Sequence, residues 1–191
     1  MTSEQPTREK ILDVVYDLVY IHGYNGTSMS MILKECGIPK GSLYHFFKSK
    51  KEMVLAVLKE RIAPKVNEFH SLKKQSNEDG LEVVINTILK TADNEKVITY
   101  GCPLNRLNQE MSAVDADFEK EMIQIYNVIK KRIVDTLDTG VIKEDIDLDS
   151  LADYIIQSFW GALSLPPEES SKQRYLDSVS HTINYLRSIK K

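Results

Sequence analysis

The sequence predicts an all-α protein. Apolar residues recur every three or four positions in segment after segment, which is the period of a helix that buries one face. The alternation of apolar and polar residues that is typical of half-buried strands is nearly absent, and the chain holds only 8 Gly and 6 Pro among 191 residues. We therefore expect about nine helices, forming an N-terminal three-helix unit with a helix-turn-helix and a larger α-helical domain.

Five segments carry the helical period most clearly. The first runs from about Thr7 to Ile21 and ends at a turn that contains Gly23 and Gly26. We expect the apolar residues of each segment to face a core. They are Ile11, Val14, Val15, Leu18 and Val19; Leu81, Val84, Ile85 and Ile88; Phe118, Met122, Ile125, Ile129, Ile133 and Leu137; Leu151, Tyr154, Ile155 and Phe159; and Leu176, Val179, Ile183 and Leu186.

Residues 27–47 have the pattern of two short helices joined by a tight turn. Thr27 or Ser28 is suited to cap the first helix, and Gly37 stands where the chain needs a left-handed residue to leave it. Pro39 suits the first turn of the second helix, where a missing N–H costs nothing. The apolar residues of the two short helices are spaced so that they can pack into one small core across the turn. This segment therefore predicts a helix-turn-helix.

The second of these short helices leaves polar side chains on its outer face. Lysine and histidine can donate to guanine acceptors in the major groove, and a glycine allows close approach of the backbone. A tyrosine hydroxyl can donate to a phosphate. The outward residues are Lys40, Gly41, Ser42, Tyr44 and His45.

A further signal follows at Ser49 and Glu52, which have the Ser-x-x-Glu spacing of a capping box at a helix start. The charge changes here as well. Residues 34–52 hold five lysines and two glutamates, and residues 1–61 hold 9 Lys and Arg against 7 Asp and Glu, whereas residues 62–191 hold 16 against 21. The formal charge of −3 therefore conceals a basic patch suited to a polyanion.

Residues 8–58 resemble the N-terminal domain of the TetR family of bacterial transcriptional regulators, most closely in the run from Ile38 to Lys50. The resemblance implies that the second short helix reads DNA. Four residues would then face the bases, namely Lys40, Gly41, Ser42 and His45. Four others would hold the DNA backbone, namely Thr27, Ser28, Tyr44 and Lys50.

The resemblance also implies a division of the chain. Residues 1–50 would be the DNA-binding domain, a helix over about 49–63 would link it to the rest, and residues 51–191 would bind an effector and dimerise. A homodimer would match a palindromic double-stranded DNA operator with half-sites about one turn apart. The apolar stripes of the last two helices are candidates for the dimer seam, and the alternative is that they face only their own subunit's core.

Gly101, Cys102 and Pro103 predict a helix start in the C-terminal portion. A thiol close to unsatisfied helix amides, with Arg106 one turn on, is favoured as the reactive thiolate. The segment partly resembles a Gly-Cys motif found in a TetR subgroup that includes thiol-based sensors of electrophiles or oxidants. The alternatives are a pocket that binds a small molecule reversibly and an inert, buried Cys102. Candidate effector residues are Tyr100, Cys102, Asn105, Arg106, Phe159 and Trp160.

Other classes of protein have little support in the sequence. Two cysteines and four histidines are too few for a disulfide framework or a thiolate zinc site, so we expect no metal and no cofactor. Phosphate-loop, metalloprotease and nucleophile-elbow motifs are absent, which argues against an enzyme. No signal peptide or membrane span is evident, so we expect a cytoplasmic protein.

We therefore predict a transcriptional regulator, most simply a repressor that leaves its operator when a small molecule or a thiol-reactive compound binds. Two alternatives remain at this point. One is a helical protein-interaction adaptor that does not bind DNA, and the other is a cysteine-dependent enzyme built on Cys102.

Overall fold

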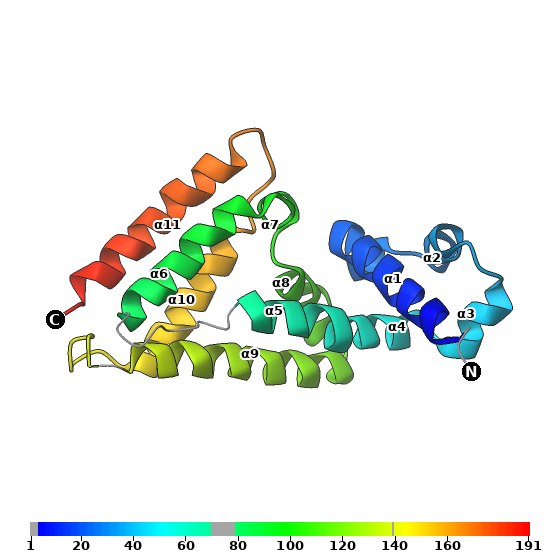
Figure 1. The fold of residues 1–191 in the computed structure, drawn as a ribbon, viewed down its shortest axis with the longest axis horizontal. Helices are drawn as coiled ribbons and strands as arrows, with labels where there is room; N and C mark the ends of the chain where they lie inside the picture. Colours follow the sequence, from blue (N-terminus) through cyan, green and yellow to red (C-terminus); the bar gives the residue numbers. More distant parts are fainter. Residues whose placement is uncertain (1–3, 70–78, 139) are drawn as a thin grey trace. The chain divides into compact units, whose positions relative to one another are not determined.

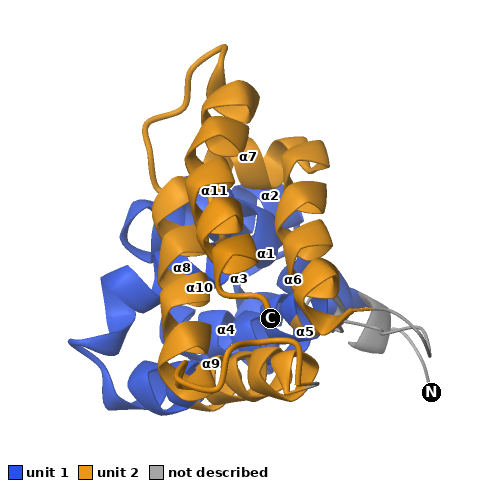
Figure 2. Ribbon diagram, turned by 90° about the vertical axis from the view of Figure 1, so that its left-hand side faces the viewer, with its two compact units in different colours: residues 1–66, 103–123 blue, residues 67–102, 124–191 orange. Residues whose placement is uncertain are grey.

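The computed structural model describes residues 4–69, 79–138 and 140–191, and it divides them into two compact units. Unit 1 comprises residues 1–66 and 103–123, and unit 2 comprises residues 67–102 and 124–191 (Figure 2). These units are defined by packing. The predicted functional boundary near residue 50 stays a prediction.

Unit 1 contains the N-terminal helices and a later segment of the chain that packs with them (Figure 1). Helix α1 packs against α2, α4 and α8. The elements are α1 (Glu4–Gly26), α2 (Met29–Cys36), α3 (Lys40–Phe46), α4 (Lys50–Val57), a π-helical turn (Leu58–Ile62), the beginning of α5 (Ala63–Phe69), α8 (Pro103–Leu107), a second π-helical turn (Asn108–Ser112) and the first residues of α9 (Ala116–Leu137).

Unit 2 is built around α10 and α11, which pack against each other, with α6 against α11 (Figure 1). Within the described residues, the only extended pairing is an isolated bridge between Ile142 and Lys190. The elements are α6 (Gly80–Lys90), a 3-10 turn (Thr91–Asp93), α7 (Glu95–Tyr100), the remainder of α9, α10 (Leu148–Ala162) and α11 (Ser171–Ser188).

The all-α prediction is confirmed. Over the described residues the number of separate helices is close to the nine expected, because α4 and α5 are continuous through the π-helical turn. Among the described residues, none of the helices is both long and apolar enough to cross a membrane. Most of the predicted apolar stripes are buried, including all six residues of the α9 stripe.

Pro64 does not end the helix that begins at Lys50, although a helix over about 49–63 was expected. A proline in a helix removes the N–H that would bond the carbonyl four residues earlier, here that of Glu60. The Arg61 guanidinium donates to that carbonyl at 3.2 Å, and the adjacent turn is π-helical, with the Ala63 N–H bonded to the Leu58 carbonyl. The helix therefore continues to Phe69.

The stripes on α10 and α11 face the core of their own subunit. Leu151, Ile155, Val179 and Leu186 are all less than 5% exposed. Leu176 is half-buried. Tyr154 is exposed, at 40%, and packs edge-to-face on Tyr185, which is 42% exposed. The prediction that Tyr154 belongs to the buried stripe is therefore wrong: the residue lies on the outer side of the helix.

Candidate nucleic-acid interface and effector region

The helix-turn-helix has the local geometry that its sequence predicts. Ser28 caps α2 by accepting a hydrogen bond from the Met31 N–H, and Gly37 ends α2 in the left-handed region with φ 62°. Pro39 is the N-cap of α3 and so lies one residue before the helix. The apolar residues expected to form the small core are buried, namely Ile32, Cys36, Leu43 and Phe47.

The capping box at α4 forms with one difference from the expected pattern. Ser49 accepts a hydrogen bond from the Glu52 N–H at 3.1 Å. The Glu52 carboxylate reaches back to the N–H of Lys48, at 2.7 Å, one residue before the cap. Two N–H groups at the start of α4 are thus satisfied within the chain, which fixes where α4 follows α3.

The outer face of α3 is open to solvent. Lys40, Tyr44 and His45 are exposed, with the Lys40 ammonium 5.7 Å from the centre of the Tyr44 ring, and Ser42 is half-buried. A Cβ built at Gly41 would meet no atom within 4 Å. Nothing in this chain's own packing therefore requires glycine at that position, which is compatible with a requirement imposed by a partner.

Two of the residues predicted to bind the DNA backbone form hydrogen bonds within the protein instead. The Thr27 side chain is fully buried and its hydroxyl donates to the Gly23 carbonyl at 2.7 Å. The Lys50 ammonium donates to the carbonyls of Tyr24 and Thr27 and lies 4.2 Å from the centre of the Tyr24 ring. Both side chains tie the end of α1 to the helix-turn-helix, so their positions do not favour the phosphate contacts expected of them.

The glycine of the Gly-Cys motif has a structural explanation. Gly101 ends α7 with φ 79° and ψ −174°, a conformation almost restricted to glycine. A Cβ there would lie 3.0 Å from the Leu163 carbonyl oxygen, just after α10. Cys102 is half-buried, whereas Cys36 is fully buried, and burial raises the pKa of the Cys36 thiol. Neither cysteine is part of a disulfide.

The six predicted effector residues fall into both units. Tyr100, Cys102, Phe159 and Trp160 belong to unit 2, where Tyr100 is 37% exposed and Phe159 is buried. Asn105 and Arg106 lie on α8 in unit 1. Asn105 is buried, and the Arg106 guanidinium donates to the Tyr20 and Ile21 carbonyls of α1.

Trp160 adjoins a charged cluster between α9 and α10. Its ring lies 5.9 Å from that of Tyr126, whose hydroxyl donates to Asp153 at 2.5 Å. Burial, and then this hydrogen bond, raise the pKa of Tyr126 to about 12. The ammonium of Lys130 bonds the same carboxylate at 2.8 Å and is the main reason that the pKa of Asp153 is lowered.

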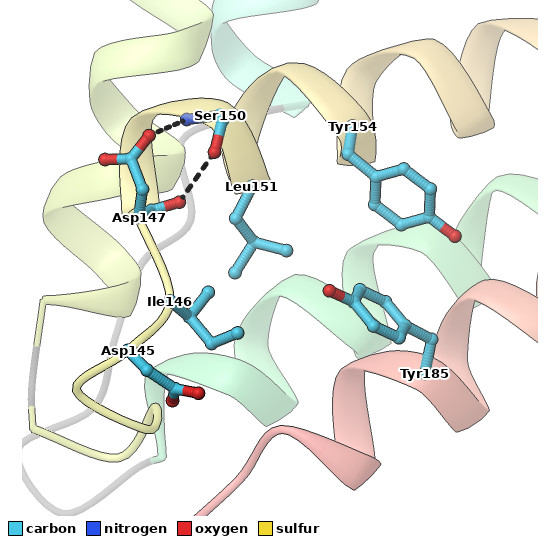
Figure 3. A pocket seen from close by; sticks show the side chains of 7 residues that line it. All are labelled: Asp145, Ile146, Asp147, Ser150, Leu151, Tyr154 and Tyr185. Atoms are coloured by element: carbon cyan, nitrogen blue, oxygen red, sulfur yellow. Dashed lines mark hydrogen bonds between the residues drawn. The ribbon is translucent and has the colours of Figure 1, made fainter.

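One pocket of unit 2 is lined by none of the predicted effector residues. It opens beside the start of α10 and the Tyr154–Tyr185 pair, whose ring centres are 5.3 Å apart (Figure 3). The Asp147 carboxylate caps α10 through the Ser150 N–H. No motif in the sequence marks this pocket, since its lining residues come from a loop and from two helices distant in the chain. They are Asp145, Ile146, Asp147, Ser150, Leu151, Tyr154 and Tyr185.

Residues 11–57 match the family described as bacterial regulatory proteins, tetR family. A helix-turn-helix transcriptional regulator in the lacX 3' region of Lactococcus lactis subsp. lactis is 35% identical over 167 residues, which are 83% of this chain and 82% of that protein. The chain belongs to the TetR family. The HTH-type transcriptional repressor DhaR of a Mycobacterium species (strain GP1) is 26% identical over 165 residues, covering 83% of this chain and 81% of DhaR.

The fold of this TetR-family chain also matches solved structures. A TetR transcriptional regulator from Chloroflexus aurantiacus superposes with a TM-score of 0.82 at 24% identity, covering 100% of this chain and 98% of that one. The chain is thus a DNA-binding transcriptional regulator of an all-α family, as predicted, and the adaptor alternative loses its support. The Gly-Cys subgroup and the individual contact residues stay predictions.

Sequence reasoning missed several residues that hold α1 and α4 to the later segment of unit 1. Glu110 lies four residues after Arg106, and its carboxylate accepts hydrogen bonds from the N–H groups of Tyr24 and Asn25. The Lys51 ammonium bonds both Asp115 and Asp117 at 2.7 Å. Charged residues are common on helix surfaces, so only the three-dimensional contacts single these out.

Proposed function

We propose that this TetR-family regulator is a repressor that binds a palindromic operator as a homodimer and is released by a small-molecule or thiol-reactive effector. The proposal that the protein reads DNA is supported by the composition of the outer face of α3. That face combines exposed Lys40, Tyr44 and His45 with a glycine for which the chain's own packing gives no reason. These are the donor groups and the close approach that major-groove reading needs.

Within this proposal, Lys40, Gly41, Ser42 and His45 face base edges, and Tyr44 binds a phosphate. Ser28 lies at the N-terminus of α2, where backbone amides add to the favourable field for a second phosphate. Thr27 and Lys50 act indirectly, because their side chains hold the end of α1 against α2 and α4.

Replacing Tyr44 with Phe should weaken binding to all duplex sequences by a similar factor, on the order of five to tenfold, because a phosphate contact carries no sequence information. Replacing Lys40 with Ala should instead lower the preference for the operator over altered sites, by about tenfold at one base pair. In-vitro selection of the bound sequence, followed by titration with the selected and point-altered duplexes, measures both effects.

The same selection tests the dimer, since two inverted half-sites about one turn apart are expected. A single, non-repeated site would contradict the homodimer. If both variants bound every duplex as the parent does, α3 would not be the DNA-reading helix. Binding that does not weaken strongly between low and moderate salt would also argue against a lysine-rich phosphate contact.

The dimer proposal uses the outer sides of α10 and α11. Their apolar stripes are buried within the subunit, which leaves the Tyr154–Tyr185 pair exposed on the same face as the pocket (Figure 3). Exposed aromatic pairs on helices are typical anchors of a protein interface. Two such faces, related by a two-fold axis, would form a four-helix seam.

For the effector, we propose the surroundings of Gly101 and Cys102. Cys102 is the more accessible of the two cysteines and directly precedes α8, and Gly101 lies against the end of α10, which carries Phe159 and Trp160. An effector bound here would favour a spacing of the two recognition helices that does not fit the operator. The helix that begins after Ser49 would carry the change, and the effector's higher affinity for that spacing would release the DNA.

N-ethylmaleimide tests the thiol version, since the Cys102 thiolate adds across the maleimide double bond and a proton from water completes the adduct. We expect modification of Cys102 well before Cys36, whose thiol is buried, with at least a tenfold loss of operator affinity. Cys102→Ser should keep its affinity under the same treatment. Mass spectrometry of the peptides and DNA titration are the two measurements.

A protein alkylated at Cys102 that still bound its operator normally would rule out thiol sensing. In that case a screen of small molecules for release of the operator tests the reversible version. Release that persists in Cys102→Ser would support it, and failure of both treatments to release DNA would contradict an effector site at this segment.

A further inference from the structure

Helix α1 is interrupted at Gly23, which has φ 76° and ψ 176°. In an uninterrupted helix the Tyr24 N–H would bond the Tyr20 carbonyl, and the Asn25 N–H would bond the Ile21 carbonyl. The break separates the donors from the acceptors and leaves four backbone groups that need other partners. We call residues 20–27 the Gly23 corner.

Two side chains one helical turn apart supply all four of these partners. The Arg106 guanidinium donates to the carbonyls of Tyr20 and Ile21, at 3.0 and 3.3 Å. The Glu110 carboxylate accepts from the N–H groups beyond the break, at 3.2 and 2.9 Å. The cation lies on the carbonyls and the anion on the N–H groups, as charge complementarity requires.

The backbone of the corner lies directly against the Glu110 carboxylate. A Cβ at Gly23 would come within 2.2 Å of a carboxylate oxygen of Glu110, so the backbone and the carboxylate are in direct contact. Nearby, the Tyr24 ring packs edge-to-face on Phe118, which is fully buried. A shift of the segment that carries Arg106 and Glu110 must therefore either move the corner or break charged hydrogen bonds.

The other side of the corner is held by the DNA-binding elements. Lys50, the first residue of α4, bonds the carbonyls of Tyr24 and Thr27. Ser28, which follows the corner directly in the chain, is the N-cap of α2. The same eight-residue corner thus contacts the segment that follows Cys102 in the chain and the helices that position α3.

We propose that the Gly23 corner couples the segment Pro103–Ser112 to the helix-turn-helix, with Arg106 and Glu110 as the positioning residues. The inference rests on the proposed function, because it assigns the route by which an effector near Cys102 reaches α2 and α3. This route acts on α1 and α2 directly and adds to any movement of α4. Because coupling is reciprocal, DNA binding at α3 must also act on the segment Pro103–Ser112, and we expect it to stabilise the hydrogen bonds made there.

Hydrogen–deuterium exchange of the full-length protein, with and without the selected operator duplex, tests this coupling. In the parent, DNA should slow exchange at least threefold in peptides covering residues 38–48 and also in those covering 103–112. Glu110→Gln replaces one of two acceptor oxygens with a donor, so one N–H of the corner loses its partner. This variant should keep the DNA effect at 38–48 and lose it at 103–112.

The comparison between variants is made on the change in exchange rate that DNA causes in each protein. A merely structural role of Glu110 would speed exchange with and without DNA and leave the change itself unaltered. Glu119→Gln, an exposed carboxylate on the first turn of α9, is the matched control and should behave as the parent. Arg106→Gln is the second variant, to be used if Glu110→Gln does not fold, and it should give the same loss.

Each outcome decides. The coupling is refuted if DNA protects residues 38–48 but not 103–112 in the parent. It is also refuted if Glu110→Gln and Arg106→Gln both keep the protection at 103–112. In either case the DNA-reading role of α3 stands. If DNA protects neither region, the DNA-reading role of α3 fails and the coupling fails with it.

Discussion

Replacing Gly23 with Ala is expected to lower the free energy of unfolding by about 2 to 6 kcal/mol. The backbone at φ 76° and ψ 176° lies in a region almost restricted to glycine, which costs a side chain about 1 to 3 kcal/mol. The new methyl group would also overlap a Glu110 oxygen, and relieving such an overlap costs about 1 to 3 kcal/mol more. Moving the carboxylate away is no remedy, since it would abandon the N–H groups of Tyr24 and Asn25.

Gly37→Ala is the matched control, because Gly37 also has a positive φ, 62°, but a Cβ there would meet nothing within 4 Å. Its expected cost is about 1 to 2 kcal/mol, the strain alone. Urea unfolding of the three proteins at one fixed concentration measures both values. A loss in Gly23→Ala no greater than in Gly37→Ala would contradict the contact between Gly23 and Glu110.

Replacing Gly41 with Glu should abolish operator binding without harming the fold. A Cβ at Gly41 meets open space, glutamate is a better helix former than glycine, and a carboxylate at the second residue of α3 suits the helix N-terminus. We therefore expect unfolding stability equal to or slightly above that of the parent. Against DNA the same side chain brings negative charge and bulk to the proposed groove contact, so operator affinity should fall at least about a hundredfold, or about 2.7 kcal/mol.

Gln124→Glu controls for the change in net charge, because it adds one negative charge at an exposed position of α9. Its operator affinity should stay within about threefold of the parent at moderate salt, where distant charges are screened. Both variants are compared by DNA titration and urea unfolding. Normal operator binding by Gly41→Glu would show that this face of α3 is not the one that meets DNA.

The helix-turn-helix was predictable because its signals are local. Ser28, Gly37 and Ser49 act on backbone groups within three or four residues, and each does in the structure what its residue type favours. The family model matches the same segment, residues 11–57, and the similarity to the Lactococcus lactis regulator extends over 83% of the chain. Pro64 was misjudged because its effect depends on a π-helical turn and on a side chain, Arg61, that replaces the lost donor.

The surroundings of Gly101 and Arg106 depend on contacts between distant parts of the chain. The glycine at 101 is explained by its φ of 79° and its approach to the Leu163 carbonyl, a contact between residues more than 60 positions apart in the chain. Arg106 was assigned to the environment of a thiol, and the structure adds its bonds to α1. No spacing rule predicts such a contact, because it depends on which helices meet.

Residue type and spacing were therefore sufficient for the helical class, the helix-turn-helix and the family, because helical periodicity, caps and left-handed glycines act over a single turn. Tertiary packing decided which charged side chains form hydrogen bonds to distant backbone groups. From the sequence, Lys50 was expected to bind the DNA backbone and Arg106 to favour a thiolate, and nothing singled out Glu110. In the fold all three side chains bond backbone groups of the Gly23 corner. Buried or half-buried backbone groups must find partners, and when a helix breaks these partners come from wherever in the chain the fold brings charge close.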